Sequence, residues 1–191
     1  MLRKILILMM LPLLAFSAED KYVIDKTHFS VGFLVEHIGY AKTLGMFRDI
    51  DGSYSHDLDN NKINNINIVI KTGSVFTNHD KRDQHLMSPD FLNVDKFPEM
   101  LFKATDINIK DDITTINGEL TLLGITKPLI LTGKINKIGK YPFGGIIKPY
   151  VMGISARGTI KRSQHGMNYA LKDDLVGDEI DLIIEFEARR Q

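Results

Sequence analysis

Hydrophobic and polar residues alternate with a period of two along most of this chain, most clearly near its C-terminal end. There Ile180, Leu182, Ile184 and Phe186 share one face, while the opposite face is mainly acidic. The same alternation recurs within residues 29–35, 66–70, 100–104, 116–122, 129–135 and 154–160, with turn-forming residues between the runs. Many antiparallel strands with one apolar face predict a closed barrel or a two-sheet sandwich, and the pattern alone does not choose between them.

The segment from residue 78 to 105 interrupts this alternation. Residues 78–87 contain almost no apolar side chains, Asn78 is a suitable N-cap, and Asp80 and Asp83 fall in the first turns of the helix that it would start. Ser88 precedes a proline and therefore disfavours helical backbone, so the helix is expected to end there. An apolar plug follows, formed by Phe91, Leu92, Val94 and Phe97. A short charged helix and an apolar plug between two strands predict a lid over one end of a barrel.

This segment also carries a family resemblance. The pattern consists of Arg82-Asp83, Leu86, Ser88-Pro89-Asp90-Phe91, Phe97-Pro98 and Phe102-Lys103. It extends upstream to Asp25, His28, Phe33, His37, Gly45, Phe47 and Gly52, and downstream to residues 118–124 and 126–128, Arg162 and Gly166-Met167. In the order and spacing of these residues the chain resembles the YceI-like family, which are secreted bacterial lipid-binding proteins. Phe29 departs from the small polar residue that is frequent in the family.

The resemblance implies an all-β fold, an antiparallel eight-stranded lipocalin-like barrel with a short helix as a lid between strands. A barrel of this size either fills with side chains or encloses one small ligand. The apolar residues expected to face inward fit both outcomes equally well. The sequence alone therefore does not decide between a filled core and a cavity. The resemblance favours a long apolar cavity.

The ligand-binding residues predicted from the shared faces, the plug and the resemblance are Phe33, Val35, His37, Phe47, Phe91, Phe97, Phe102, Leu120, Leu122, Leu131, Ile184 and Phe186. His37 is included because it could point into the barrel mouth and meet a ligand head group. The lid and rim residues are Arg82, Asp83 and Arg162. Arg82 is expected to anchor the lid helix to the rim, and a solvated helix face is the alternative interpretation of this charged pair.

The chain lacks the motifs of common catalytic and metal sites. There is no cysteine, no Gly-x-Ser-x-Gly, no phosphate-binding loop and no His-Glu-x-x-His. His79 and His85 would lie on different faces of a helix, and His28 is expected to hydrogen-bond near Asp25 instead of binding a metal. We therefore predict no catalytic residue, no metal and no cofactor other than a bound lipid.

The first residues are typical of a secretory signal. Arg3 and Lys4 precede an apolar run over residues 5–14, and the small residues Ala15 and Ser17 occupy the −3 and −1 positions of a cleavage site. The apolar run is too short to span a bilayer. We expect residues 1–17 to be a signal peptide and residues 18–191 to form one lipid-binding domain. Without residues 1–17 the chain has two more acidic than basic residues, which argues against a nucleic-acid partner.

We expect the mature protein to begin at Ala18 or Glu19 and to appear in the periplasmic or secreted fraction. Cleavage after Ala18 instead of Ser17 would place the bulky Phe16 at the −3 position, so we favour Ala18 as the new N-terminus. N-terminal sequencing of protein from fractionated cells measures this directly. Recovery of the uncleaved chain in the inner membrane would contradict the prediction.

The sequence therefore favours a periplasmic carrier that sequesters a long apolar lipid. The resemblance implies polyisoprenoids, isoprenoid quinones or fatty amides as ligands, and it suggests a homodimer. Transient contact with a membrane is a further expectation. Two alternatives remain open at this level. One is a lipid-modifying enzyme or metalloprotein that uses rim histidines, and the other is a filled barrel that serves as an interaction module.

Overall fold

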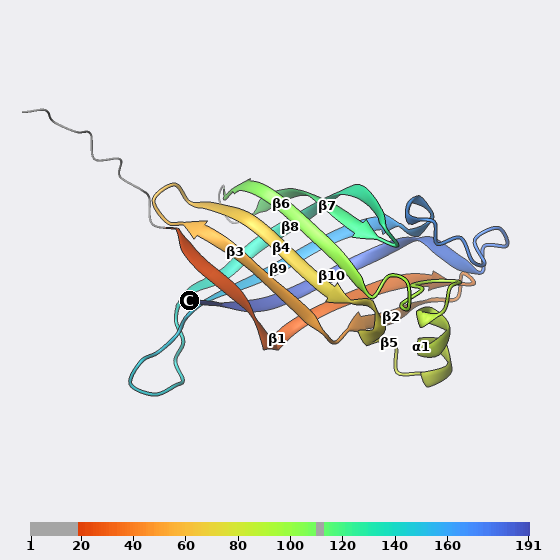
Figure 1. The fold of residues 1–191 in the computed structure, drawn as a ribbon, viewed down its shortest axis with the longest axis horizontal. Helices are drawn as coiled ribbons and strands as arrows, with labels where there is room; N and C mark the ends of the chain where they lie inside the picture. The colour runs from red at the N-terminus through yellow and green to blue at the C-terminus, as the bar shows by residue number, and fades with distance from the viewer. Residues whose placement is uncertain (1–18, 110–112) are drawn as a thin grey trace, which may run out of the picture.

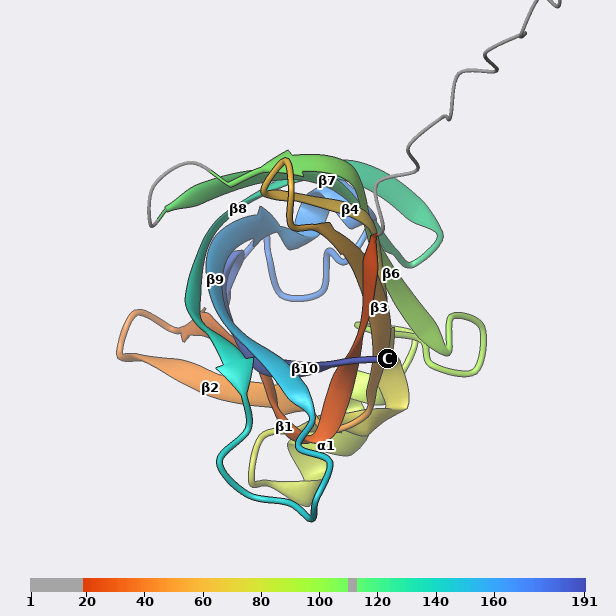
Figure 2. The same cartoon turned by 90° about the vertical axis from the view of Figure 1, so that its left-hand side faces the viewer.

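The protein is an elongated antiparallel β-barrel with most of its irregular structure at one end (Figure 1). The computed structural model describes residues 19–109 and 113–191. Eight strands close the barrel in the order β10-β9-β8-β7-β6-β4-β3-β1, with β10 paired back to β1. Their bounds are β1 Asp20–His37, β3 Ile50–Asp57, β4 Lys62–Lys71, β6 Glu99–Asn108, β7 Thr114–Leu122, β8 Ile125–Lys140, β9 Tyr150–Lys161 and β10 Val176–Arg190. Figure 2 looks along the barrel and shows the ring of strands.

The structure confirms the eight-stranded barrel that the resemblance implied, which is one of the two architectures that the alternation predicted. Residues of the apolar faces, such as Leu120, Leu122 and Leu131, are buried inside the barrel, while their sequence neighbours Asn117, Glu119 and Thr132 are exposed. Because side chains alternate across a strand, each run of period two places one hydrophobic row inside and one polar row outside. Because β10 pairs back to β1, the first and last strands of the barrel both have neighbours on two sides.

A bulge in β1 changes the face that its residues present. Ile24 pairs with Ala188 and Phe29 pairs with Phe186, so four residues of β1 lie opposite the single Glu187 of β10. Inward residues before the bulge are even-numbered, as with Ile24, and those after it are odd-numbered, as with Val31 and Phe33. The extra residues form a bulge within the strand, which a period-two pattern does not predict.

The second half of β1 bends into a small extension at the lid end of the barrel. There β1 pairs with β2 (Ala41–Phe47), and β2 pairs with the two-residue β5 (Val75–Phe76), which follows the 3₁₀ helix η1 (Thr72–Ser74). Gly45 of β2 lies opposite Phe33, and a Cβ at this position would collide with the Phe33 ring. A glycine is therefore required for Phe33 to lie flat against β2.

The lid helix α1 spans Asp80–Met87. The N-cap is His79, whose Nδ1 accepts a hydrogen bond from the backbone N–H of Arg82 at 3.2 Å. The expectation that Asn78 would cap this helix was wrong, because Asn78 adopts a positive φ of 60° and instead turns the chain one residue earlier. Ser88 ends the helix before a proline, as expected. Among the described residues, no helix combines the length and the apolar content needed to cross a membrane.

Candidate functional site: an apolar cavity with a two-part lid

The barrel interior contains a cavity of about 210 Å³. All eight barrel strands contribute to its wall, and Leu86 of α1 with Phe91 and Leu92 of the plug line it at one end. The polar side chains in the lining are few, and most of the wall is aliphatic or aromatic. Representative lining residues are Ile24, Val31, Ile66, Ile68, Met100, Phe102, Ile116, Leu122, Leu131, Ile154, Ile160, Leu182 and Ile184.

Most of the residues predicted to contact a ligand line this cavity. They are Phe33, Val35, Phe47, Phe91, Phe102, Leu120, Leu122, Leu131, Ile184 and Phe186. The alternation identified eight of these positions, because the barrel wall keeps a regular pleat through most of its length, whereas Phe47 and Phe91 were included from the resemblance and the plug.

His37 and Phe97 lie outside the cavity lining, so the structure places them differently from the prediction. His37 is exposed at the end of β1, where its pairing with β10 shifts register between Val35 and His37. Phe97 is half-buried against Gly124, whose positive φ of 73° belongs to the turn between β7 and β8. His37 ends a strand where the pairing is irregular, and Phe97 lies in the loop before β6, so strand alternation sets the direction of neither side chain.

The lid helix is fastened to the chain just before it. The Arg82 Nε donates to Thr77 Oγ1 at 2.7 Å, and its Nη2 donates to the Thr77 carbonyl at 2.6 Å. The buried carboxylate of Asp83 accepts hydrogen bonds from the backbone N–H and the hydroxyl of Thr77. Thr77 follows β5 directly, so this pair fixes α1 to the strand extension beside the barrel mouth.

The lid has a second part, the segment between β9 and β10. It begins with the 3₁₀ helix η2 (Arg162–His165), and its Met167 side chain lines the cavity. Tyr169 of this segment contacts the rings of His85 and Phe91, with centroids 4.9 Å and 5.1 Å away. These edge-to-face and tilted contacts join the two parts of the lid above the cavity.

Arg162 organises the second part of the lid from inside. It is 1% exposed and donates to four backbone carbonyls, those of Gly177, Met167, Tyr169 and Val176, at distances of 2.6–2.9 Å. Burial lowers the pKa of Arg162, and the nearby Asp178 carboxylate opposes that shift. This rim residue therefore holds the segment between β9 and β10 in place through its backbone.

The opposite end of the cavity is closed by a polar aromatic group that the pattern did not identify. Tyr22 and Tyr54 stack with ring centroids 5.3 Å apart, and the Tyr54 hydroxyl donates to Met152 Sδ at 3.2 Å. The Tyr22 hydroxyl and both ring nitrogens of His56 are buried without a hydrogen-bond partner among the described residues. Burial raises the pKa of both tyrosines, so their hydroxyls stay protonated. Tyr54 and His56 both lie on the inward row of β3, and this position is the feature of the sequence from which the group could have been predicted.

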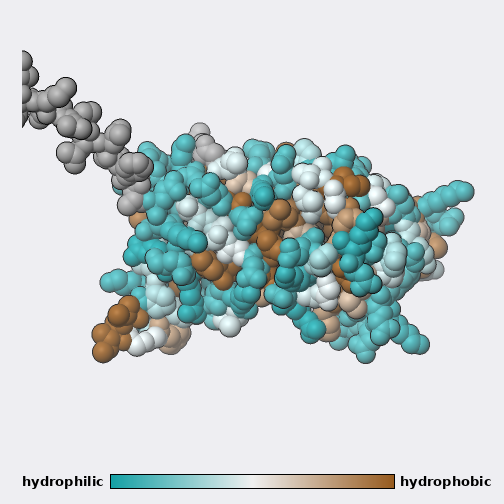
Figure 3. Space-filling model, viewed as in Figure 1, coloured by the Kyte–Doolittle hydropathy of each residue, from teal (hydrophilic) through white to brown (hydrophobic). Residues whose placement is uncertain are grey.

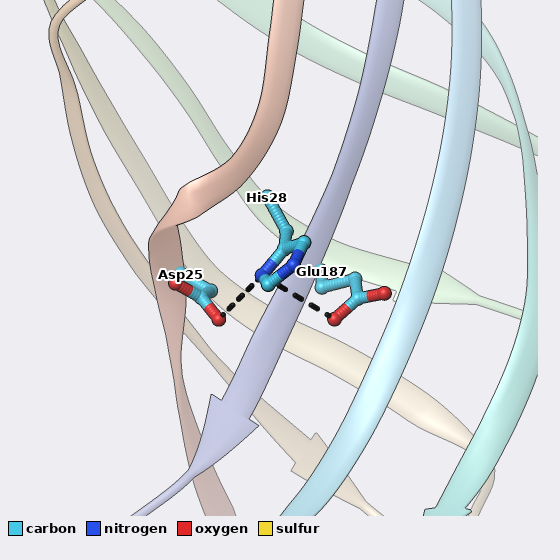
Figure 4. Close-up of side chains that lie close together, drawn as sticks. All are labelled: Asp25, His28 and Glu187. Carbon is cyan, nitrogen blue, oxygen red and sulfur yellow. Dashed lines mark hydrogen bonds and ion pairs between the residues drawn. The ribbon is translucent and has the colours of Figure 1, made fainter. Parts of the chain in front are cut away.

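A second group of polar side chains lies at the bulge of β1 and consists of Asp25, His28 and Glu187 (Figure 4). Their ligand atoms lie within 4.8 Å of one another, which is a spacing that could suit a metal. The carboxylate of Asp25, however, already accepts hydrogen bonds from Thr27, from His28 Nδ1 at 3.1 Å, and from Arg189 Nε at 2.8 Å. The guanidinium of Arg189 therefore already compensates the charge of Asp25.

The same contacts determine the charge of Asp25. Burial alone would favour its neutral form, but the hydrogen bonds from Thr27, His28 and Arg189 outweigh burial and hold the pKa of the carboxyl well below its usual range. The cluster therefore stabilises the bulge as an ion pair, and the hydrogen bond expected between His28 and Asp25 is present.

Arg82→Ala is expected to increase the rate of ligand release while leaving the thermal unfolding of the barrel almost unchanged. The substitution removes the two hydrogen bonds to Thr77 that fasten α1 and leaves the strand pairing of the barrel intact. Lids open locally at low free-energy cost, whereas strands part only with global unfolding. Release can be followed by transfer of a fluorescent apolar probe to acceptor vesicles.

Lys81→Ala on the exposed face of the same helix is the matched control and should leave release unchanged. Equal release rates for Arg82→Ala and the unmodified protein would contradict the assignment of α1 as the gate. The contradiction would be stronger if changes within residues 139–149, at the other end of the barrel, altered the rate instead.

Known proteins resemble this chain in both sequence and fold. A family model described as the YceI-like domain matches residues 22–188. Protein YceI of Escherichia coli is 40% identical over 174 residues, which cover 89% of this chain and 87% of that protein. The YCEI protein of Campylobacter jejuni is 29% identical and superposes with a TM-score of 0.69, covering 82% of this chain and 90% of that chain. A polyisoprenoid-binding domain from Saccharophagus degradans superposes with a TM-score of 0.67 at 10% identity, covering 89% and 98% of the two chains.

A closed antiparallel barrel around an apolar cavity is the architecture of the lipocalin-like class of binding proteins. The family model covers nearly all of the barrel, and the identity to Escherichia coli YceI extends over most of both chains. The chain belongs to the YceI-like family.

Proposed function

We propose that this protein is a periplasmic carrier that encloses one long apolar lipid in its barrel. The observation that carries the proposal is the cavity of 210 Å³ with an almost wholly apolar wall. Apolar cavities of roughly 150 Å³ exclude water and bind small hydrocarbons. The wall extends from Ile24 and Tyr54 near one end to Leu86 and Met167 under the lid, so the space suits an extended chain.

The cost of the cavity supports a ligand over a filled barrel. Residual cavity volume destabilises a protein by about 24 cal/mol per Å³, so a space of 210 Å³ costs on the order of 5 kcal/mol. That figure is comparable to the whole net stability of a small domain, about 5–15 kcal/mol. A bound hydrocarbon that fills the space restores the missing contacts, whereas a barrel acting only as an interaction module has no use for it.

The binding energy would come from burial and not from chemistry. Each methylene that the cavity buries contributes about 0.8 kcal/mol, so the gain before costs grows with the length of chain that is enclosed. Association and ordering of the chain cost about 4–15 kcal/mol. Because few polar groups line the wall, selectivity should depend on length and shape more than on the head group. Polyisoprenoids, isoprenoid quinones and fatty amides all fit this description, and the polyisoprenoid-binding neighbour from Saccharophagus degradans supports the first of them.

The alternative of an enzyme has less support. Arg162 is the buried cation of the lining, and its donors are directed at backbone carbonyls. The candidate metal group at the bulge is compensated by Arg189 and is absent from the cavity lining. Neither arrangement positions a base or a nucleophile against a bound lipid.

Ala156→Phe is expected to reduce uptake of a long-chain fluorescent fatty amide at least about tenfold. Ala156 is 4% exposed and lines the cavity from β9, so a phenyl ring there would occupy the space that a ligand needs. The added ring can be accommodated without the usual overpacking cost of about 1–3 kcal/mol, because the space already exists.

Thr132→Phe on the exposed face of β8 adds the same ring outside the barrel and serves as the control. Uptake should be unchanged in that variant, and both variants should unfold at similar temperatures. Equal uptake by Ala156→Phe and the unmodified protein would show that the ligand does not occupy this cavity.

A further inference from the structure

The loop between β8 and β9 exposes a concentrated set of large apolar side chains. Phe143 is 74% exposed, Ile147 is 90% exposed and Ile146 is fully exposed. The loop leaves the barrel at the end opposite α1 and projects away from the wall (Figure 1). Figure 3 shows these residues as a hydrophobic tip on an otherwise mostly hydrophilic face. Large exposed apolar groups at a projecting tip mark a surface for another partner.

Contacts at the base of the loop hold its two ends together, so the tip projects into solvent and does not fold back onto the barrel. The backbone N–H of Tyr141 donates to the Pro149 carbonyl at 2.8 Å. The Tyr141 ring contacts His28 of the barrel wall at 6.4 Å between centroids. Gly144, with a φ of 120°, turns the chain at the tip. Beyond this neck, the apolar side chains point into solvent.

The surroundings of the loop are basic. Lys140 and Lys148 are exposed on either side of the tip. The sequence has no acidic residue between Glu119 and Asp173, a stretch that includes β8, the loop and β9. Acidic residues of other strands do lie at this end of the barrel. Of these, Asp20 is paired with Arg190 at 2.9 Å and Asp25 with Arg189 at 2.6 Å. Glu187 lies further back, 4.0 Å from the ring of His28 at the neck. A negatively charged partner would therefore meet two lysines beside the apolar tip.

We propose that residues 141–149 form a membrane-docking loop that inserts its apolar tip into the surface of an anionic bilayer. Phe143, Ile146 and Ile147 would enter the boundary between head groups and acyl chains, and the flanking lysines would contact lipid phosphates. Tyr141 and Tyr150 stand at the neck, at the depth where tyrosines are enriched in membrane interfaces. A protein partner would be expected to bury a broader surface than one projecting tip.

The position of the loop sets the orientation of the docked protein. In both Figure 1 and Figure 2 the membrane-docking loop and α1 lie on the same, lower side of the barrel. A protein held through this loop would therefore keep its lid helix on the side that faces the bilayer. Docking does not depend on what the barrel contains, so it can be tested separately from the proposed carrier function.

A single tryptophan provides a direct test, because the chain contains none. We expect the emission of Phe143→Trp to shift to the blue on addition of vesicles of phosphatidylglycerol and phosphatidylethanolamine, and to be quenched by lipids brominated on their acyl chains. Ile130→Trp, at an exposed position on β8, is the matched control and should show neither change. An unchanged emission for Phe143→Trp with these vesicles would overturn the proposal.

Two further variants separate the apolar and the charged contributions. Serine at positions 143, 146 and 147 together should abolish co-sedimentation with the anionic vesicles. Lys140→Glu with Lys148→Glu should weaken it by about tenfold or more. All of these residues are exposed, so thermal unfolding should remain unchanged and report a folded protein. If the serine variant instead converts a dimer to a monomer on a sizing column and the unmodified protein ignores vesicles, the loop joins two copies of the chain and the proposal is wrong.

Discussion

Leu122→Asp is expected to abolish lipid retention, and in the same step to remove most of the stability of the barrel. Leu122 is 3% exposed on β7 and its side chain lines the cavity. Arg162, the buried cation of the lining, already donates to four backbone carbonyls and is therefore not available to pair with an ionised carboxylate at this position. The penalty for an unpaired buried charge is several kcal/mol, which is of the same order as the net stability of a small domain. The carboxylate would also stand beside any hydrocarbon in the cavity.

Asn117→Asp provides the matched control for this substitution. Asn117 lies on the same strand and its side chain is exposed, so it receives the same carboxylate on the outer face. Lipid content after purification and the midpoint of urea unfolding measure both effects. Full lipid retention and normal stability in Leu122→Asp would show that the inward face of β7 has been assigned to the wrong side.

Arg162→Leu should produce the second large effect, a loss of several kcal/mol in the free energy of unfolding together with an open lid. The substitution deprives four backbone carbonyls of their donor, and each buried carbonyl left without a partner costs about 1–3 kcal/mol. Water that enters the loosened segment will satisfy some of them. Arg162→Lys should be intermediate, because one ammonium cannot reach all four carbonyls.

Arg157→Leu is the control for charge and size on the neighbouring strand β9. Its side chain is 53% exposed and pairs with Glu185 at the surface, where such pairs contribute roughly 0–1 kcal/mol. Urea unfolding monitored by circular dichroism compares the two variants. Equal losses for Arg157→Leu and Arg162→Leu would contradict the role of Arg162 as the internal support of the lid.

The regular part of this structure could be predicted from the sequence because a barrel wall repeats one rule. Every second residue faces inward, so rows such as residues 180–186 identify both the strands and the cavity wall. The rule fails where the pleat is interrupted. The bulge of β1 inserts extra residues opposite Glu187, and the rim leaves His37 outside the cavity.

Other features of the structure depend on residues whose side chains fit more than one structural role. Tyr54 and His56 occupy the inward row of β3. Because both carry polar groups, they do not fit the apolar alternation that predicts inward-facing positions. His79 caps α1 through a ring nitrogen, a role for which asparagine is the commoner candidate. The resemblance identified Arg162 as a rim residue. Its four carbonyl partners, however, come from two segments of the chain, and no local sequence pattern predicts that these segments lie side by side.

The most direct test of the central claim is the lipid content of the protein as purified from its native compartment. Organic extraction followed by mass spectrometry should recover a long apolar molecule in a ratio of about one per folded barrel, and the Ala156→Phe variant should yield much less. Native mass spectrometry of the intact protein should show the same molecule as a mass addition that disappears on denaturation. Protein that is fully folded, contains no apolar molecule and takes up none from vesicles would contradict the account of the barrel as a lipid carrier.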